Sequence, residues 1–198
     1  MKEFFTNSMN IAKEICKMKI EDGDKVIDET MGKGSDTLFL ASLVGEKGEV
    51  YSFDIQNEAI QATKEKLQRD NVKTKVNLIL DGHENMDKYL EGGVKIVIFN
   101  LGYLPSFSHS ITTKANTTIE AVKKALNLLV PNGAVILVIY YGHENDKVEK
   151  EVLEDYTKQL NQKEYNVAEL EFTNQVNCPP KLLIIEKKLD KAKNKEEK

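Results

Sequence analysis

The fold of this chain is decided by one stretch, Asp28-Glu29-Thr30-Met31-Gly32-Lys33-Gly34-Ser35-Asp36-Thr37. A short apolar run precedes the stretch, and an apolar-rich segment follows it. This order predicts a strand that ends on a carboxylate, then a glycine turn, and then a helix. The two glycines let the backbone fold tightly and approach a ligand where a Cβ would block it. The free N–H groups at the start of the helix would face the same ligand.

The composition is that of an ordinary soluble domain, with 198 residues of which 40% are hydrophobic and 30% charged. No apolar run reaches the roughly 18–20 residues that span a bilayer, and the first residues lack the apolar core of a signal peptide. We therefore expect a cytoplasmic protein with no membrane partner. Cys16 and Cys178 form no Cys-x-x-Cys pair, so we expect neither a metal site nor a disulfide.

The net charge of −4 is unevenly distributed along the chain. The last twelve residues hold six lysines against three acids, which makes the remainder more acidic than the total. Such a field opposes broad, sequence-blind binding of nucleic acid, but it does not exclude one specific RNA.

Strand patterns alternate with helix patterns along the chain. Strands are expected to begin at 26 and to cover 50–54, 76–81, 96–100, 134–140, 167–172 and 182–186. Helices are expected at 8–19, with Ser8 as the N-cap, after 37, around 60–67, at 85–90, around 119–129 and at 146–161. The alternation predicts an α/β protein with a Rossmann-like, doubly wound, mostly parallel seven-stranded sheet. The segment between the last two strands is too short for a helical crossover, so the last strand should be antiparallel.

The domain organisation follows from the same pattern. We expect a single domain over residues 1–188, in which residues 1–20 form an N-terminal helix or lid. Residues 189–198 are expected to be a disordered, lysine-rich tail.

Three of the expected strands end in acids, Asp28, Asp54 and Asp81, which should meet at one rim of the sheet. Asp54 follows Gly34 by about 20 residues, the spacing of an acid that grips a ribose hydroxyl pair. Asp81 begins the run Asp81-Gly82-His83, where an acid or its neighbours could meet an adenine amino group. A nucleoside cofactor explains all three positions.

The glycine turn favours one cofactor over another. A dinucleotide fingerprint needs a third glycine, where this chain has Thr37, and its pyrophosphate would lie close to Asp28 and Asp36. S-adenosylmethionine carries no phosphate, and its ammonium group suits a carboxylate. We therefore predict S-adenosylmethionine, with a nicotinamide or flavin dinucleotide as the alternative.

The fourth strand leads into Asn100-Leu101-Gly102-Tyr103-Leu104-Pro105. Amine and amide methyltransferases often place an Asn/Asp-Pro-Pro-Tyr motif here, and this chain keeps the asparagine and the aromatic residue without the two prolines. An amide oxygen accepts a hydrogen bond from N–H without competing as a nucleophile, so a nitrogen is favoured as the target. An asparagine that only caps its own loop is the alternative.

Two further loops should open on the same rim. In Tyr141-Gly142-His143 the histidine could orient substrate or relay a proton, or it could be a loop residue with a backbone partner. The turn-rich segment 174–180 holds Asn174, Gln175 and Asn177, which could read a base or sugar edge or could form a polar turn stiffened by two prolines. Residues 106–113 could form a lid.

With these motifs the chain resembles the class I S-adenosylmethionine-dependent methyltransferases. More narrowly, it resembles a bacterial family described as rRNA methylases, which includes the tRNA 5-aminomethyl-2-thiouridine methyltransferase. The first three motifs, at 28–37, 53–56 and 81–83, are shared by many methyltransferases, whereas those at 100–105, 141–143 and 174–180 are together much narrower. The family commonly has glycines where this chain has Ser106 and Asn145-Asp146.

The resemblance implies an enzyme that methylates a nitrogen, with the 5-aminomethyl group of a modified wobble uridine in the tRNA anticodon stem-loop as its acceptor. An rRNA base, a protein amide or a small metabolite remain alternative acceptors, and a non-catalytic cofactor-binding or RNA-binding module is a further one. A homodimer is left open.

The expected catalytic residues are Asn100, Tyr103 and His143, of which Tyr103 and His143 are the candidate proton acceptors. The expected cofactor residues are Asp28, Thr30, Gly32, Gly34, Asp36, Thr37, Asp54, Ile55, Gln56, Asp81, Gly82, His83 and Asn100. The expected substrate residues are Tyr103, Pro105, Thr112, Thr113, Tyr141, His143, Asn174, Gln175 and Asn177.

Overall fold

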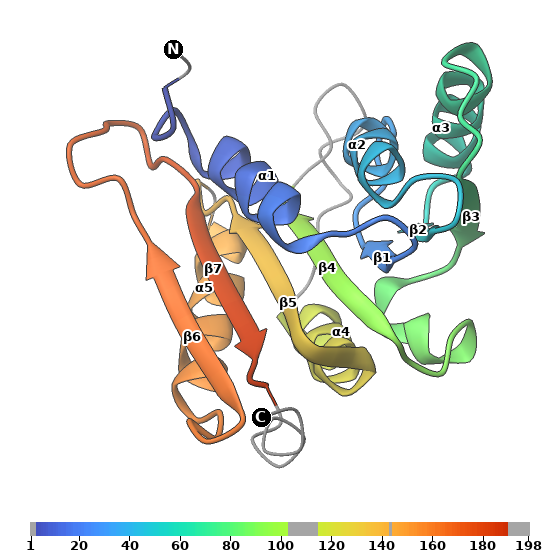
Figure 1. Ribbon diagram of the computed structural model, residues 1–198. Coiled ribbons are helices and arrows are strands. Elements are labelled where there is room, and N and C mark those ends of the chain that lie inside the picture. Colours follow the sequence, from blue (N-terminus) through green and yellow to red (C-terminus); the bar gives the residue numbers. More distant parts are fainter. Residues whose placement is uncertain (1–2, 103–114, 143, 190–198) are drawn as a thin grey trace, which may run out of the picture.

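One seven-stranded sheet organises the protein, in the strand order β3-β2-β1-β4-β5-β7-β6 (Figure 1). The structure, a computed structural model, describes residues 3–102, 115–142 and 144–189, apart from the side chains of 144–146. The strands that pair with β7 run antiparallel to it, and the other neighbouring strands pair in parallel. The predicted sheet, including its antiparallel last strand, is thus confirmed. The strands are β1 (Lys25–Asp28), β2 (Glu49–Asp54), β3 (Lys75–Leu80), β4 (Val94–Leu101), β5 (Leu129–Ile139), β6 (Tyr165–Leu170) and β7 (Lys181–Lys187).

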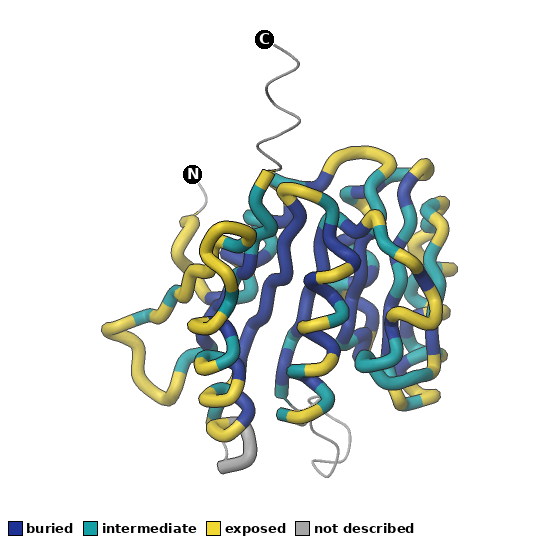
Figure 2. Tube along the Cα trace, turned by 90° about the horizontal axis from the view of Figure 1, so that it is seen from below, coloured by how far each residue is buried: buried dark blue, intermediate teal, exposed yellow. Residues whose placement is uncertain are grey.

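Helices cover both faces of the sheet. On one face lie α1 (Ser8–Lys19), α2 (Ser35–Val44) and α3 (Asn57–Arg69), and on the other lie the 3-10 helix η1 (His83–Lys88), α4 (Ala115–Leu128) and α5 (Glu144–Lys158). Successive strand residues point to opposite faces, so Val26 packs in one half of the core and Ile27 in the other. Figure 2 shows the resulting buried sheet between helices whose outer sides are exposed.

The start of α1 differs from the prediction. Asn7, rather than Ser8, is the N-cap, because the Asn7 side chain accepts a hydrogen bond from the backbone N–H of Asn10. Ser8 is fully buried, and its hydroxyl donates to the backbone carbonyl of Pro180 at the far end of the chain. α1 is therefore joined to the segment before β7.

The start of β5 also differs from the prediction. The sequence predicts a helix around 119–129 and a strand from 134, with the helix-breaking run Pro131-Asn132-Gly133 between them. In the structure α4 ends at Leu128 and β5 begins at Leu129, and the register of β5 against β4 shifts between Val94 and Ile96. The extra residues of β5 are accommodated by this irregularity, and Asn132 adopts a positive φ of 64° within it.

The carboxyl ends of β1 to β5 meet at one edge of the sheet, the upper edge in Figure 1. Strand order reverses between β1 and β4, where open α/β sheets bind their ligands. The loop between β6 and β7 reaches the same edge, because Lys181 at the start of β7 pairs with Ile139 at the end of β5. Among the described residues, no helix has both the length and the apolar character needed to cross a bilayer.

Truncating the centre of this core should be costly. Leu137 on β5 is fully buried, and Leu137→Ala should lower the free energy of unfolding by about 2–5 kcal/mol through lost burial and a residual cavity. Leu80, at the end of the edge strand β3, is 55% exposed, and Leu80→Ala is the matched control, expected to cost less than about 1 kcal/mol. Urea unfolding measures both, and equal losses would contradict the central position of β5.

Candidate functional site

The glycine turn after β1 has a conformation that excludes larger residues. Gly32 and Gly34 have φ values of 50° and 71°, in the left-handed region. A Cβ on Gly34 would lie 2.6 Å from the hydroxyl oxygen of Thr63 on α3. The Gly34 N–H donates to the carbonyl of Met31 at 2.8 Å and so closes the turn, and α2 begins directly afterwards. The turn is therefore both tight and packed against α3, which leaves its outer backbone as the surface for a ligand.

The carboxylate of Asp28 lies beneath this turn and is fully buried. It accepts hydrogen bonds from the Thr37 hydroxyl at 2.6 Å and from the Thr30 N–H at 3.2 Å. The Ser52 hydroxyl of β2 lies 2.8 Å from that of Thr37 and 3.4 Å from the carboxylate. Burial, followed by the charge of Asp36, raises the pKa of Asp28 to about 7. Asp28 and Thr37 satisfy each other inside the protein, so they shape the turn from below.

Asp54 at the end of β2 is held beside the turn. One carboxylate oxygen accepts from the Gly32 N–H at 3.0 Å, and the other accepts from the Gln56 N–H at 2.9 Å. The adjacent Ile55 is 61% exposed. This corner thus combines a fixed, partly exposed carboxylate with an apolar surface, a combination that suits a ribose and its base.

Asp81, after β3, is the third acid of the rim. Its carboxylate accepts hydrogen bonds from the Tyr89 hydroxyl, the Asn85 amide and the Gly82 N–H, all at 2.8 Å. The bond from Tyr89 is the main reason why the pKa of Asp81 lies below its usual value. Asp81 is therefore a fixed anion in the free protein.

His83 follows on η1, with its ring edge-to-face against Phe99 at a centroid distance of 5.9 Å. Burial lowers its pKa, so the imidazole is neutral at physiological pH. His83 thus acts as a packing element of this corner.

Asn100 lies near the end of β4, across from the glycine turn at the point between β1 and β4 where the strand order reverses. Its backbone N–H donates to the Thr30 hydroxyl at 2.8 Å, which joins β4 to the glycine turn. Its side-chain oxygen is buried and has no hydrogen-bond partner among the described residues. An unsatisfied buried acceptor costs about 1–3 kcal/mol, so this oxygen is suited to accept an N–H from a bound molecule.

Asp36, at the start of α2, is less available to a bound cofactor than the sequence indicates. Its carboxylate forms an ion pair with Lys13 of α1 at 2.8 Å, and the two side chains are 13% and 27% exposed. The negative charge of Asp36 is thus compensated from within the protein.

Glu29 is a residue of this region that the sequence reasoning missed. It is 2% exposed, and neither of its carboxylate oxygens has a partner among the described residues. Burial, followed by the charges of Asp28 and Glu84, raises its pKa well above the usual value, so it is a neutral acid. The only sequence signal was a second acid directly after Asp28 at the end of an apolar strand.

Only some of the residues expected to bind the methyl acceptor belong to the part of the chain that the structure describes. Tyr103, Pro105, Thr112, Thr113 and His143, with the expected lid 106–113, lie outside the described residues. Tyr141 is partly buried after β5, and the Lys150 ammonium lies 5.5 Å from the centre of its ring. Asn174, Gln175 and Asn177 are exposed on the β6–β7 loop. Within the described ranges, no three His, Cys, Asp or Glu residues are grouped as metal ligands would be.

Comparisons of sequence point to one family. The chain matches the family described as "Putative rRNA methylase" over residues 50–186. A protein of Arabidopsis thaliana named "tRNA (mnm(5)s(2)U34)-methyltransferase, chloroplastic" is 35% identical over 179 residues, which cover 85% of this chain. The match spans 65% of the Arabidopsis protein, slightly less than two thirds of its length.

Solved structures show the same likeness. A "putative rRNA-methylase" from Clostridium thermocellum is 50% identical with a TM-score of 0.90, covering 92% of this chain and 98% of that one. A "putative methyltransferase" from Streptococcus mutans, solved in complex with S-adenosylhomocysteine, is 37% identical with a TM-score of 0.84, covering 94% and 99%.

The two buried carboxyls at the end of β1 predict a pH dependence of stability. The folded protein keeps protons on Asp28 and Glu29 that the unfolded chain releases near its ordinary carboxyl pKa. The stability that these protons supply is fully present below about pH 4 and is lost as the pH rises, for Asp28 through about 7. Glu29→Gln removes one of the two groups, so its free energy of unfolding should fall less steeply between about pH 5 and pH 8 than that of the wild type. Urea unfolding across this range tests it, and parallel curves would contradict the protonated state of Glu29.

Proposed function

Since the chain belongs to the "Putative rRNA methylase" family and is an S-adenosylmethionine-dependent methyltransferase, we propose that it methylates an amine nitrogen on tRNA. The proposed acceptor is the 5-aminomethyl group of a modified 2-thiouridine at the wobble position. The observation that carries the choice of a nitrogen is the buried side-chain oxygen of Asn100, for which the described part of the chain offers no hydrogen-bond partner. The choice of tRNA is supported by the name of the Arabidopsis relative.

The rim fits S-adenosylmethionine on the chemistry of its residues. The turn backbone at Gly32 and Gly34 can approach the cofactor closely, Asp54 offers acceptors for ribose hydroxyls, and Asp81 and its neighbours would flank the base. The buried oxygen of Asn100, without a hydrogen-bond partner in residues 3–102, 115–142 and 144–189, would accept an N–H group at the same site. When bound, S-adenosylmethionine supplies a methyl group activated by a positively charged sulfur.

The contribution of the protein is mainly orientation. The Asn100 oxygen would accept a hydrogen bond from the target N–H and so direct the nitrogen lone pair. The Asn100 backbone is itself fixed by Thr30 of the glycine turn, so the two halves of the site are coupled.

An alkylammonium acceptor must lose a proton before it can attack, so a proton acceptor is needed. Burial raises the pKa of Tyr140 and of Tyr141, so both stay protonated at neutral pH and are poor bases. We propose Tyr103 or His143 for this role, as the sequence predicts.

An rRNA base is the second candidate acceptor. The matched family and the Clostridium thermocellum structure are both described as rRNA methylases. An exocyclic amine of a base also presents N–H groups, so the Asn100 oxygen alone does not separate it from the wobble side chain.

The acceptor can be identified directly. Purified protein and labelled S-adenosylmethionine are incubated with tRNA that carries the 5-aminomethyl group, with the same tRNA lacking it, and with rRNA. We expect label only in the first, recovered as a methylated wobble nucleoside by mass spectrometry. Label in rRNA alone, or equal label in both tRNAs, would contradict the proposal.

Two substitutions should separate binding from chemistry. Asn100→Ala should lower turnover by on the order of 10²-fold and leave the affinity for S-adenosylhomocysteine nearly unchanged, because the backbone bond to Thr30 survives. Asp54→Ala should instead weaken S-adenosylhomocysteine binding by about 1–3 kcal/mol through lost charge-assisted hydrogen bonds. Calorimetry and initial rates measure the two effects. Full activity of Asn100→Ala would refute its role.

A further inference from the structure

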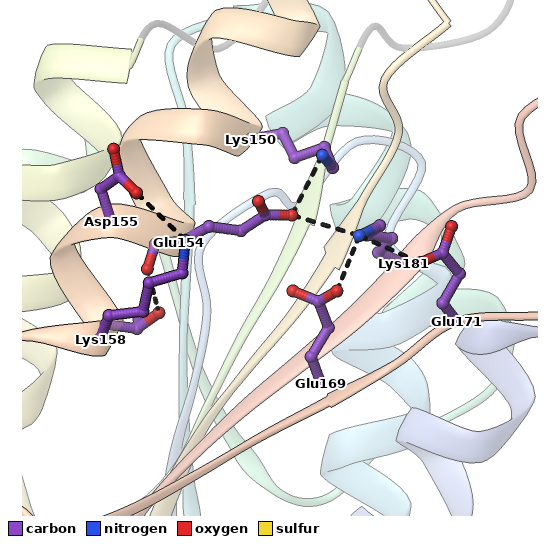
Figure 3. Close-up of polar contacts among 8 residues, drawn as sticks. Lys150, Glu154, Asp155, Lys158, Glu169, Glu171 and Lys181 are labelled. Carbon is purple, nitrogen blue, oxygen red and sulfur yellow. Dashed lines mark hydrogen bonds and ion pairs between the residues drawn. The ribbon is translucent and has the colours of Figure 1, made fainter.

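An ion cluster around the buried Lys181 lies at the base of the β6–β7 loop. The Lys181 ammonium, with an 11% exposed side chain, contacts the carboxylates of Glu169 at 2.7 Å, Glu171 at 3.2 Å and Glu154 at 3.3 Å (Figure 3). Burial alone would lower the pKa of Lys181, but hydrogen bonds to the three carboxylates outweigh it and raise the pKa well above its usual range. Lys181 is thus a permanent cation that holds α5, β6 and the start of β7 together.

The cluster extends to the end of β5. Glu154 also pairs with Lys150, one turn earlier on α5, at 3.1 Å. The Lys150 ammonium lies 5.5 Å from the centre of the Tyr141 ring, within the range of a cation–π contact. We refer to Lys150, Glu154, Glu169, Glu171 and Lys181 as the Lys181 cluster. It links Tyr141, beside the switch-point edge, to the base of the loop.

The loop is therefore held at both ends and open in its middle. Glu171 fixes its first residues, and Pro180 at its end accepts a hydrogen bond from Ser8 of α1. Residues 173–178 between these anchors are all exposed, and Val176 is 79% exposed. Fixed ends with a polar, exposed middle at the functional edge of the sheet are typical of a recognition loop.

The chemistry of the loop favours bases over phosphates. Asn174, Gln175 and Asn177 present both donors and acceptors, as the Watson–Crick edges of unpaired bases do, and the Val176 side chain offers an apolar surface. Both lysines beneath the loop are committed to carboxylates, and the three acids of the cluster outnumber them. A phosphate would meet no free cation of the cluster here.

We propose that the Lys181 cluster positions the β6–β7 loop and Tyr141 as the surface that reads unpaired nucleotides next to the methylated one. The inference rests on the proposed function, because it takes a single-stranded RNA segment as the substrate. Lys181 is a positioning residue, which acts on the acceptor through the loop and makes no contact with the cofactor corner at Asp54 and Asp81.

Lys181→Met tests this role, because methionine keeps much of the length and removes the charge. Three carboxylates would then face one another without their shared cation, and the loop ends would separate. With tRNA that carries the 5-aminomethyl group, we expect KM to rise about tenfold, kcat to change less than about threefold, and affinity for S-adenosylhomocysteine to stay the same. Lys181→Arg should restore KM. Asp155→Asn is the matched control on α5, since Asp155 is 74% exposed and pairs with Lys158 outside the cluster (Figure 3).

A second variant covers the case in which Lys181→Met fails to fold. Gln175→Ala changes an exposed loop residue, and it should raise KM for the tRNA about threefold or more without altering thermal stability. A Gln175→Ala variant with wild-type KM, or a Lys181→Met variant in which kcat falls while KM stays, overturns the inference alone. Wild-type protein that methylates none of the RNAs overturns the proposed function together with it.

Discussion

The site depends on the burial of one carboxylate, that of Asp28, beneath the glycine turn. Its hydrogen bonds to Thr37, Thr30 and Ser52 join the end of β1, the turn, the start of α2 and the middle of β2. A buried anion is costly unless it is hydrogen-bonded, so the turn must close around it. The raised pKa of about 7 shows that these bonds only partly offset the cost of burial. The shape of the turn is thus set from below, largely by the fully buried side chains of Asp28, Thr37 and Ser52.

A count of the acids at the rim overstates the negative charge that a ligand would meet there. Of the acids at the rim and turn, Asp36 is compensated by Lys13, and Glu29 is held neutral by burial. Asp54 and Asp81 remain partly exposed, each fixed by hydrogen bonds from neighbouring groups. The rim therefore offers two oriented carboxylates, which we propose face the nucleoside end of the cofactor, while Asp36 and Glu29 add little repulsion or attraction of their own.

The sequence predicted the fold well because strand and helix periodicity is local. The seven strands, the reversed last strand and the acids at the carboxyl edge all follow from spacing and alternation. The details that it missed depend on partners far away in the chain. Ser8 was expected to cap α1, yet it bonds to Pro180, and the Lys181 cluster draws its acids from α5 and β6. The neutral state of Glu29 depends on burial, which periodicity does not quantify.

The site has one half that is proposed to bind the cofactor and another that is proposed to bind the methyl acceptor, and the two are built differently. The cofactor half, at β1 to β3, is built from backbone groups and carboxylates, such as Asp54 and Asp81, whose geometry is fixed by hydrogen bonds within the protein. The acceptor half combines Asn100 with the β6–β7 loop, and these lie on opposite sides of β5. In the proposed function Asn100 acts on the reacting group through an amide oxygen that suits any N–H, beside a proton acceptor, Tyr103 or His143. We propose that the loop selects the substrate, because its exposed amides are available to the nucleotides around the reacting nitrogen. With these proposed roles, a chain of this architecture would keep its chemistry and change its substrate through alterations in the β6–β7 loop alone.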